Sequence, residues 1–155
     1  MSISVQEADF DTGAEIDTLG AGGAIGAVVS FVGLMRDMRG DTAIRAMTLE
    51  HYPGMTEKAL ASIERQARSR WDVQRVRIIH RIGRLMPEDR IVLVAVASKH
   101  RGEAFAACQF IMDYLKTDAP FWKKEETAEG GHWVEARSSD DDARRRWNDE
   151  AKPNG

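Results

Sequence analysis

The chain has 155 residues, 43% hydrophobic and 30% charged, which predicts one soluble globular domain whose core needs no stabilising cross-links. A formal net charge of −3 argues against a general nucleic-acid binder, and a single cysteine excludes an internal disulfide and a cysteine-based zinc site. No apolar run approaches the roughly 18 residues of a membrane span, and the N-terminus lacks a secretory signal, so we expect a cytoplasmic protein without membrane contact.

The N-terminal part of the chain predicts a short strand followed by a short helix. Ile3 and Val5 alternate with polar residues, as in a half-buried strand. Asp11 and Thr12 can cap a helix that runs through Leu19, and a glycine-rich stretch then stops this helix.

Two strands joined by a charged loop are expected next. Residues 24–32 are rich in Val, Ile and Phe and predict a buried strand. Residues 36–41 are charged and contain a glycine, which favours a loop. Residues 44–52 resume a strand, and Pro53-Gly54 turns the chain.

The middle of the chain predicts two helices that flank a pair of strands. Apolar residues recur at helical spacing over residues 55–71 and form one core-facing stripe. Residues 73–82 and 90–98 predict strands separated by a turn at residues 86–89. The second long helix carries Cys108 on its apolar face, so we interpret this cysteine as a core residue and not as a nucleophile.

Pro120 ends the second long helix, because proline disfavours helical geometry in the preceding residue. Residues 121–126 and 132–136 predict a strand pair. We expect residues 1–137 to form one domain and residues 138–155 to be a charged, flexible tail in which Trp147 can still dock. The order of elements predicts an α+β fold with a mostly antiparallel sheet.

Residues 114–126 interleave aromatic side chains with lysines. Lys116 lies at a helix end, where the dipole favours a cation, so a solvated surface lysine is one interpretation. In the other interpretation, Phe121 and Trp122 wall a pocket in which Lys116 loses solvation and its pKa falls, as acid–base chemistry requires. The residue pattern leaves both interpretations open.

Two more basic groups are candidates for anion binding. His100 and Arg101 precede the second long helix, whose N-terminal N–H groups can hold a phosphate. Arg36 and Arg39 follow a predicted strand and offer forked donors to a phosphate or carboxylate. Solvated loop residues are the alternative interpretation in both cases.

The four histidines show none of the spacings of a metal site. His51 and His80 lie within predicted strands and are interpreted as structural, and His132 is interpreted as a loop residue. We therefore predict no metal and no other cofactor.

Several motifs, kept in order and spacing from about residue 24 to residue 137, closely resemble the large subunit of molybdopterin synthase. They are Leu49-Glu-His-Tyr-Pro-Gly-Met55, His80-Arg-Ile-Gly83, Ser98-Lys-His-Arg101, Ala104-Phe105, Phe110-Ile-Met-Asp-Tyr-Leu-Lys-Thr117, Ala119-Pro-Phe-Trp-Lys123 and Trp133-Val-Glu135. The resemblance implies an α/β-hammerhead type of fold with an added small β subdomain. It also implies a sulfurtransferase that converts cyclic pyranopterin monophosphate to molybdopterin, the dithiolene ligand of the molybdenum cofactor.

The resemblance further implies partners and site residues. Sulfur arrives as a thiocarboxylate on the C-terminal Gly-Gly of a small ubiquitin-like subunit, and a homodimer of the large subunit forms the centre of a heterotetramer. The implied catalytic residues are Lys116 and Lys123. The implied substrate-binding residues are Leu34, Met35, Arg36, His100, Arg101, Lys116, Lys123, Lys124 and Glu125.

A helix that is straight from Arg101 to Lys116 separates these residues by about 22 Å, at 1.5 Å per residue. One compact pocket in a single copy cannot readily hold both, so we hypothesise a site shared between subunits, to which the neighbour supplies His100 and Arg101. A non-catalytic module that binds a pterin phosphate or a ubiquitin-like tail is the alternative function. An RNA-binding α+β domain is a weaker third interpretation, because the chain is acidic overall.

Overall fold

The computed structural model describes residues 2–39, 42–127, 130–134 and 145–147. The predicted C-terminal tail of residues 138–155 therefore lies outside the described residues, apart from a helical turn at 145–147. Among the described helices, none combines the length and the apolar character needed to cross a membrane. In chain order the elements are β1 (Ile3–Gln6), α1 (Thr12–Leu19), β2 (Ala27–Leu34), β3 (Met38–Arg39), β4 (Thr42–His51), α2 (Met55–Arg70), β5 (Arg75–Arg81), β6 (Gly83–Leu85), β7 (Arg90–Ser98), α3 (Arg101–Asp118), β8 (Phe121–Thr127) and β9 (Gly130–Val134).

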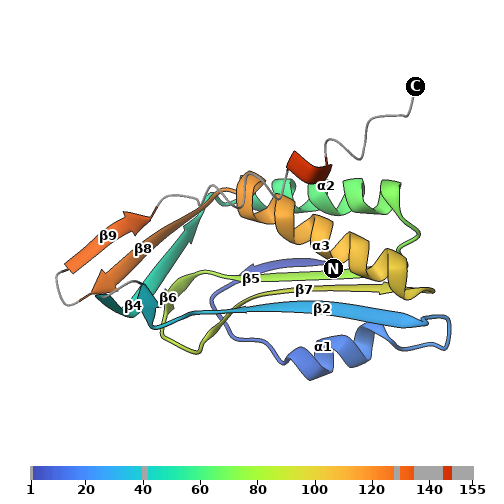
Figure 1. The fold of residues 1–155 in the computed structure, drawn as a ribbon, viewed down its shortest axis with the longest axis horizontal. Helices are drawn as coiled ribbons and strands as arrows, with labels where there is room; N and C mark the ends of the chain where they lie inside the picture. Colours follow the sequence, from blue (N-terminus) through green and yellow to red (C-terminus); the bar gives the residue numbers. More distant parts are fainter. Residues whose placement is uncertain (1, 40–41, 128–129, 135–144, 148–155) are drawn as a thin grey trace.

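Two sheets form the framework, and the α+β prediction with mostly antiparallel pairing is confirmed. The first sheet has the strand order β1-β5-β7-β2, in which β1 pairs with β5 in parallel and the other pairs are antiparallel. The second sheet has the order β3-β4-β8-β9, with β6 also paired to β4. Figure 1 shows α2 and α3 over one face of the first sheet, α1 over the other face, and the second sheet at one end of the molecule.

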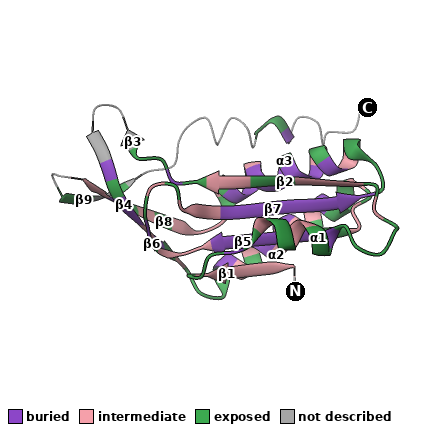
Figure 2. Cartoon of the chain, turned by 90° about the horizontal axis from the view of Figure 1, so that it is seen from below, coloured by how far each residue is buried: buried purple, intermediate pink, exposed green. Residues whose placement is uncertain are grey.

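Three groups of buried side chains connect these layers. The largest lies between the first sheet and the helices α2 and α3, and includes Leu60 and Phe110. A second group lies under α1, and a third, which includes Met35 and Leu49, joins the two sheets. The central strand β7 is buried along almost its whole length, as Figure 2 shows, because it has strands on both sides and helices on both faces.

Most predicted helices and strands are confirmed, and the local reasons are visible. Asp11 caps α1, since its side chain accepts a hydrogen bond from the Ala14 N–H at 3.1 Å. Residues 90–98 form β7 as expected. Trp147 docks as the sequence allowed, because it is only 5% exposed and its Nε1 donates to the Asp113 carboxylate at 2.6 Å.

The structure corrects several expectations about strands and loops. The strand β2 is not buried, since it lies at the edge of its sheet and Phe31 is 41% exposed. Residues 36–41 are not wholly a loop, because β3 forms a hairpin with the start of β4. His132 lies in β9 opposite Glu125, which agrees with the strand predicted at residues 132–136 and not with the interpretation of His132 as a loop residue. The short strand β6 was not foreseen, because three residues carry no periodic signal.

Candidate functional site

Lys116 lies in the last turn of α3 and is exposed. The helix ends two residues later, and Ala119 has the extended backbone (φ −81°, ψ 129°) expected before a proline. The connection to β8 is fixed by the buried Thr56 of α2, whose hydroxyl donates to the Pro120 carbonyl at 3.0 Å. Because Thr56 and Pro120 are 64 positions apart, sequence periodicity carried no sign of this contact.

The first residue of β8 packs on a buried histidine of the other sheet. The rings of Phe121 and His80 stack with centroids 3.7 Å apart and an interplanar angle of 16°. The His80 Nδ1 lies 2.8 Å from the Arg81 carbonyl, and since a carbonyl only accepts, this nitrogen carries the proton and Nε2 does not. The stack therefore joins the two sheets beside the end of α3.

The pKa of His80 depends on its burial and on the charges around it. Burial lowers the pKa of His80 to about 4, the hydrogen bond with the Arg81 carbonyl opposes this, and the charges of Lys116 and His51 lower it further. His51 ends β4 and lies 3.5 Å from the Glu57 carboxylate. The structure thus brings Lys116 and His51 into the electrostatic neighbourhood of His80, although the sequence indicated only a structural role for both histidines.

The alternation of β8 divides its side chains between two faces. Phe121, Lys123 and Glu125 share one face, and Glu125 is a buried carboxylate at 4% exposure. Trp122 and Lys124 point to the opposite face, where both are exposed. The two aromatic rings therefore do not line one pocket, and the two lysines do not point in the same direction. Lys123 lies on the same face of β8 as Phe121, whose ring stacks on His80.

Arg36 follows the end of β2 and is exposed. The pairing of β2 with β7 shifts register between Gly33 and Leu34. After this shift the Leu34 side chain is 55% exposed, whereas Met35 is 5% exposed and lies in the core between the sheets. The Met35 N–H and carbonyl are both hydrogen-bonded to the turn at residues 88–89, and the Asp37 carbonyl accepts from the Ile44 N–H at 2.6 Å. Arg36 is therefore an exposed side chain on a backbone that is held on both sides.

His100 and Arg101 are exposed at the start of α3, where His100 is the N-cap residue. The pairing of Ala27 with Ser98 puts the start of β2 at this end of the sheet, and the pairing of Leu34 with Arg90 puts its end at the other. Since α3 runs back along the sheet, Arg101 and Lys116 are about 22 Å apart.

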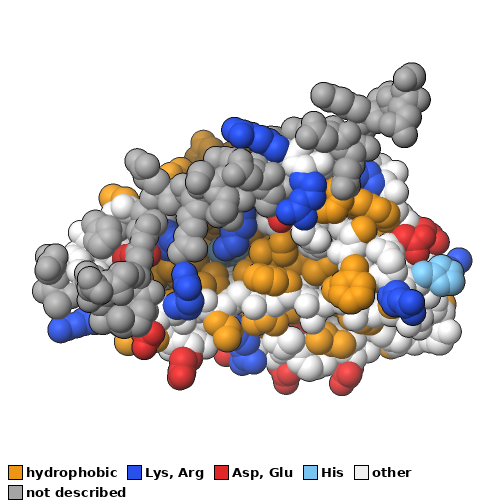
Figure 3. Space-filling model, in the orientation of Figure 1, with side chains coloured by type: hydrophobic (Ala, Val, Ile, Leu, Met, Phe, Trp, Pro, Cys, Tyr) orange, Lys and Arg blue, Asp and Glu red, His pale blue; other side chains and the backbone are white. Residues whose placement is uncertain are grey.

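The structure therefore brings Arg36, Lys116 and Lys123 to the end of the molecule where the second sheet begins, and leaves His100 and Arg101 at the far end (Figure 1). Figure 3, in the orientation of Figure 1, shows basic side chains on both sides of a hydrophobic area of the surface. The cations at the first end can bind an anion, and a lysine amine can exchange protons with it. Within the described residues, no three His, Cys, Asp or Glu side chains gather as a metal site requires.

Comparison with known proteins gives a consistent result. A model of the family described as MoaE protein matches residues 5–118. The molybdopterin synthase catalytic subunit of Ralstonia nicotianae is 63% identical over 147 residues, which cover 94% of this chain and 84% of that protein. A solved structure, the molybdopterin biosynthesis MoaE protein from Burkholderia ambifaria, superposes with a TM-score of 0.80 at 54% identity and covers 95% of this chain and 98% of that one.

A further similarity concerns the fold alone. A chain in the protein–protein complex of subunits 1 and 2 of the molybdopterin-converting factor from Helicobacter pylori superposes with a TM-score of 0.75 at 18% identity. That match covers 89% of this chain and 93% of the other. The arrangement of sheets and helices is thus shared even where few residues are.

Proposed function

The chain belongs to the MoaE protein family, and we propose that it is the catalytic subunit of a molybdopterin synthase and acts as a sulfurtransferase. Its sulfur donor is the C-terminal thiocarboxylate of a small ubiquitin-like subunit, and its substrate is cyclic pyranopterin monophosphate. The observation that carries this proposal is the 63% identity to a molybdopterin synthase catalytic subunit over 94% of the chain. The placement of Arg36, Lys116 and Lys123 at one end of the molecule supports it.

The residue types suit this reaction. The cyclic phosphate needs cationic donors, which Arg36 supplies from a fixed backbone. Sulfur attack opens the phosphate ring and requires proton transfers, which Lys116 and Lys123 perform beside the His80–Phe121 stack. An extended Gly-Gly tail has no side chains that would clash in a narrow channel, and its negative charge is drawn toward the lysines.

Reconstitution with the thiocarboxylated carrier and cyclic pyranopterin monophosphate tests the proposal. The wild-type chain is expected to form the dithiolene product, and Lys116→Ala to lose roughly 10²–10⁴-fold in rate, as the removal of an acid–base group usually does. Absence of product with wild type rejects the whole assignment. A Lys116→Ala enzyme as fast as wild type rejects only the role of that lysine.

A non-catalytic module that binds a pterin phosphate or a ubiquitin-like tail is the alternative. Such a module would bind its ligand with an affinity that depends on Arg36 and would show no turnover that depends on Lys116. Measuring substrate affinity and turnover on the same Lys116→Ala preparation separates the two functions. Unchanged affinity with lost turnover favours the enzyme.

We also propose that the active site is shared between two copies of this chain, with His100 and Arg101 of one copy completing the site around Lys116 of the other. The separation of about 22 Å along α3 supports this arrangement. Exposed apolar side chains on β2 and α3, Phe31 at 41% and Phe105 at 61%, offer surface for a homodimer that carries one small subunit on each side.

Complementation tests the shared site. When inactive Lys116→Ala and Arg101→Ala chains are mixed in equal amounts, half of the dimers are mixed, and each mixed dimer holds one intact site. About a quarter of the wild-type activity should therefore return. If each site were built from one copy, mixing would restore nothing.

A further inference from the structure

The turn between β6 and β7 holds the backbone from which Arg36 extends. The Met35 N–H donates to the Asp89 carbonyl at 3.0 Å, and the Met35 carbonyl accepts from the Glu88 N–H at 2.9 Å. The Met35 side chain is 5% exposed, so its packing fixes this point from the other side. The position of the Arg36 backbone therefore depends on the conformation of residues 86–89.

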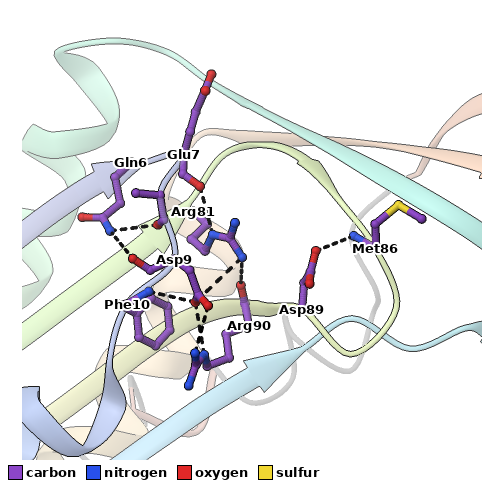
Figure 4. Close-up of polar contacts among 9 residues, drawn as sticks. Gln6, Glu7, Asp9, Phe10, Arg81, Met86, Asp89 and Arg90 are labelled. Carbon is purple, nitrogen blue, oxygen red and sulfur yellow. Dashed lines mark hydrogen bonds and ion pairs between the residues drawn. The ribbon is translucent and has the colours of Figure 1, made fainter.

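Asp89 closes this turn with its side chain. Its carboxylate accepts from the Met86 N–H at 2.7 Å (Figure 4), and its own N–H donates to the Met86 carbonyl at 3.0 Å. Within the turn, Glu88 has φ 76°, a left-handed conformation that a residue with a side chain rarely adopts. The hydrogen bonds of Asp89 hold Glu88 in this conformation, and without them the turn is expected to relax.

The residue after the turn is anchored as well. Arg90 donates from Nε and Nη2 to the two carboxylate oxygens of Asp9, at 3.1 and 2.9 Å, and its carbonyl accepts from Arg81 at 3.0 Å (Figure 4). The hydrogen bond from Arg90 is the main reason that the pKa of Asp9 falls to about 2, so the pair stays charged at neutral pH. The base of the turn is thus fixed, and Asp89 controls its tip.

We propose that Asp89 is a positioning residue for Arg36: by closing the 86–89 turn it holds Met35 and fixes the direction in which the Arg36 guanidinium meets the substrate phosphate. The proposal rests on the proposed function, in which Arg36 binds that phosphate. A guanidinium on a fixed backbone loses less conformational freedom on binding than one on a mobile loop.

Steady-state kinetics of the complex with its thiocarboxylated carrier test this role. Asp89→Ala is expected to raise the KM for cyclic pyranopterin monophosphate by roughly 5–10-fold while kcat changes less than about 2-fold, because phosphate binding is present before and during the reaction. The KM for the carrier should stay unchanged. Asp89→Asn keeps an oxygen that can accept from the Met86 N–H, so it should restore the wild-type KM.

A double-mutant cycle with Arg36→Ala shows whether Asp89 acts through Arg36. In the Arg36→Ala background, Asp89→Ala should add less than about 2-fold to KM. The matched control is Asp11→Ala, which removes the same kind of side-chain bond, to the Ala14 N–H at the start of α1, and should leave KM unchanged. If Asp89→Ala does not accumulate as a folded protein, Asp89→Glu replaces it, with the same expected rise in KM.

Three results would overturn the inference. The first is a wild-type KM in folded Asp89→Ala, and the second is an effect of Asp89→Ala that multiplies fully with that of Arg36→Ala. The third is an Arg36→Ala enzyme with unchanged KM, in which case the proposed phosphate role of Arg36 fails and the inference falls with it. Loss of dithiolene formation by the wild-type chain would be a different failure, that of the proposed function itself.

Discussion

Trp147 tests how much the C-terminal segment contributes to stability. Its ring lies edge-on to Trp71 and Phe110, with centroids 5.5 Å away in each case, and its Nε1 donates to the Asp113 carboxylate at 2.6 Å. Replacing a buried aromatic residue with alanine costs about 3–5 kcal/mol, so Trp147→Ala is expected to lower the free energy of unfolding by this amount. Trp147→Phe keeps a ring but loses the bond to a charged acceptor, which costs about 1.5–3 kcal/mol.

Urea unfolding followed by far-ultraviolet circular dichroism measures both changes, at one fixed protein concentration because dissociation of the proposed dimer would also contribute. A chain of this size changes its Tm by about 2–4 °C per kcal/mol. In thermal unfolding, the Tm of Trp147→Ala should therefore lie roughly 10 °C below that of wild type. Trp133→Ala is the control, since this tryptophan is 56% exposed. If Trp147→Ala is as stable as that control, the docked helical turn contributes nothing and the reasoning from burial is refuted.

Three further predictions concern His80, Gly26 and Cys108. His80, whose pKa falls from 6.5 to about 4 on folding, is neutral when folded, so stability is full above pH 6.5 and is lost as pH falls toward 4. Between these pH values His80 accounts for a loss of about 3 kcal/mol in the free energy of unfolding. His80→Phe should abolish this part of the loss, as urea titrations across the range can measure. Gly26→Ala puts a Cβ into the Lys99 carbonyl and should cost more than about 2 kcal/mol, whereas Gly20→Ala, with only ordinary contacts, should change stability by less than about 0.5 kcal/mol. Burial raises the pKa of Cys108 to about 11, so a thiol reagent should label native protein at least ~10-fold more slowly than unfolded protein; equal rates would contradict a core position.

The elements with strong local signals could be predicted from the sequence. The helix α2 shows one apolar stripe, α1 has its Asp11 cap, and Pro120 ends the last long helix, and in each case the determining residues lie within one or two turns of each other. The exposure of β2 could not be predicted, because a run of apolar residues looks the same in a central and an edge strand. The strand pairing of residues 38–39 depends on β4, which was likewise invisible locally.

The candidate site was only partly predictable for the same reason. The position of Lys116 at a helix end follows from local sequence. The contact between His80 and Phe121 joins residues 41 positions apart in different sheets, and the hydrogen bonds of Met35 with residues 88 and 89 cross from the end of one strand to the start of another. Such contacts are set by sheet register and by the path of α3, which no motif contains.

The path of α3 also restricts how an assembly of this chain can work. Because α3 folds back along β7 and β2, every copy carries Lys116 at one end and Arg101 at the other. If both act on one substrate, two copies must meet so that unlike ends lie together. A two-fold axis satisfies this condition at both ends at once, since the contact of residue i with residue j is repeated as j with i. Such a dimer has two equivalent sites and no unfilled end, whereas a head-to-tail contact without the axis would leave one site incomplete at each end of a chain of copies. The separation along α3 therefore favours a two-fold dimer with two active sites, each open to its own sulfur carrier.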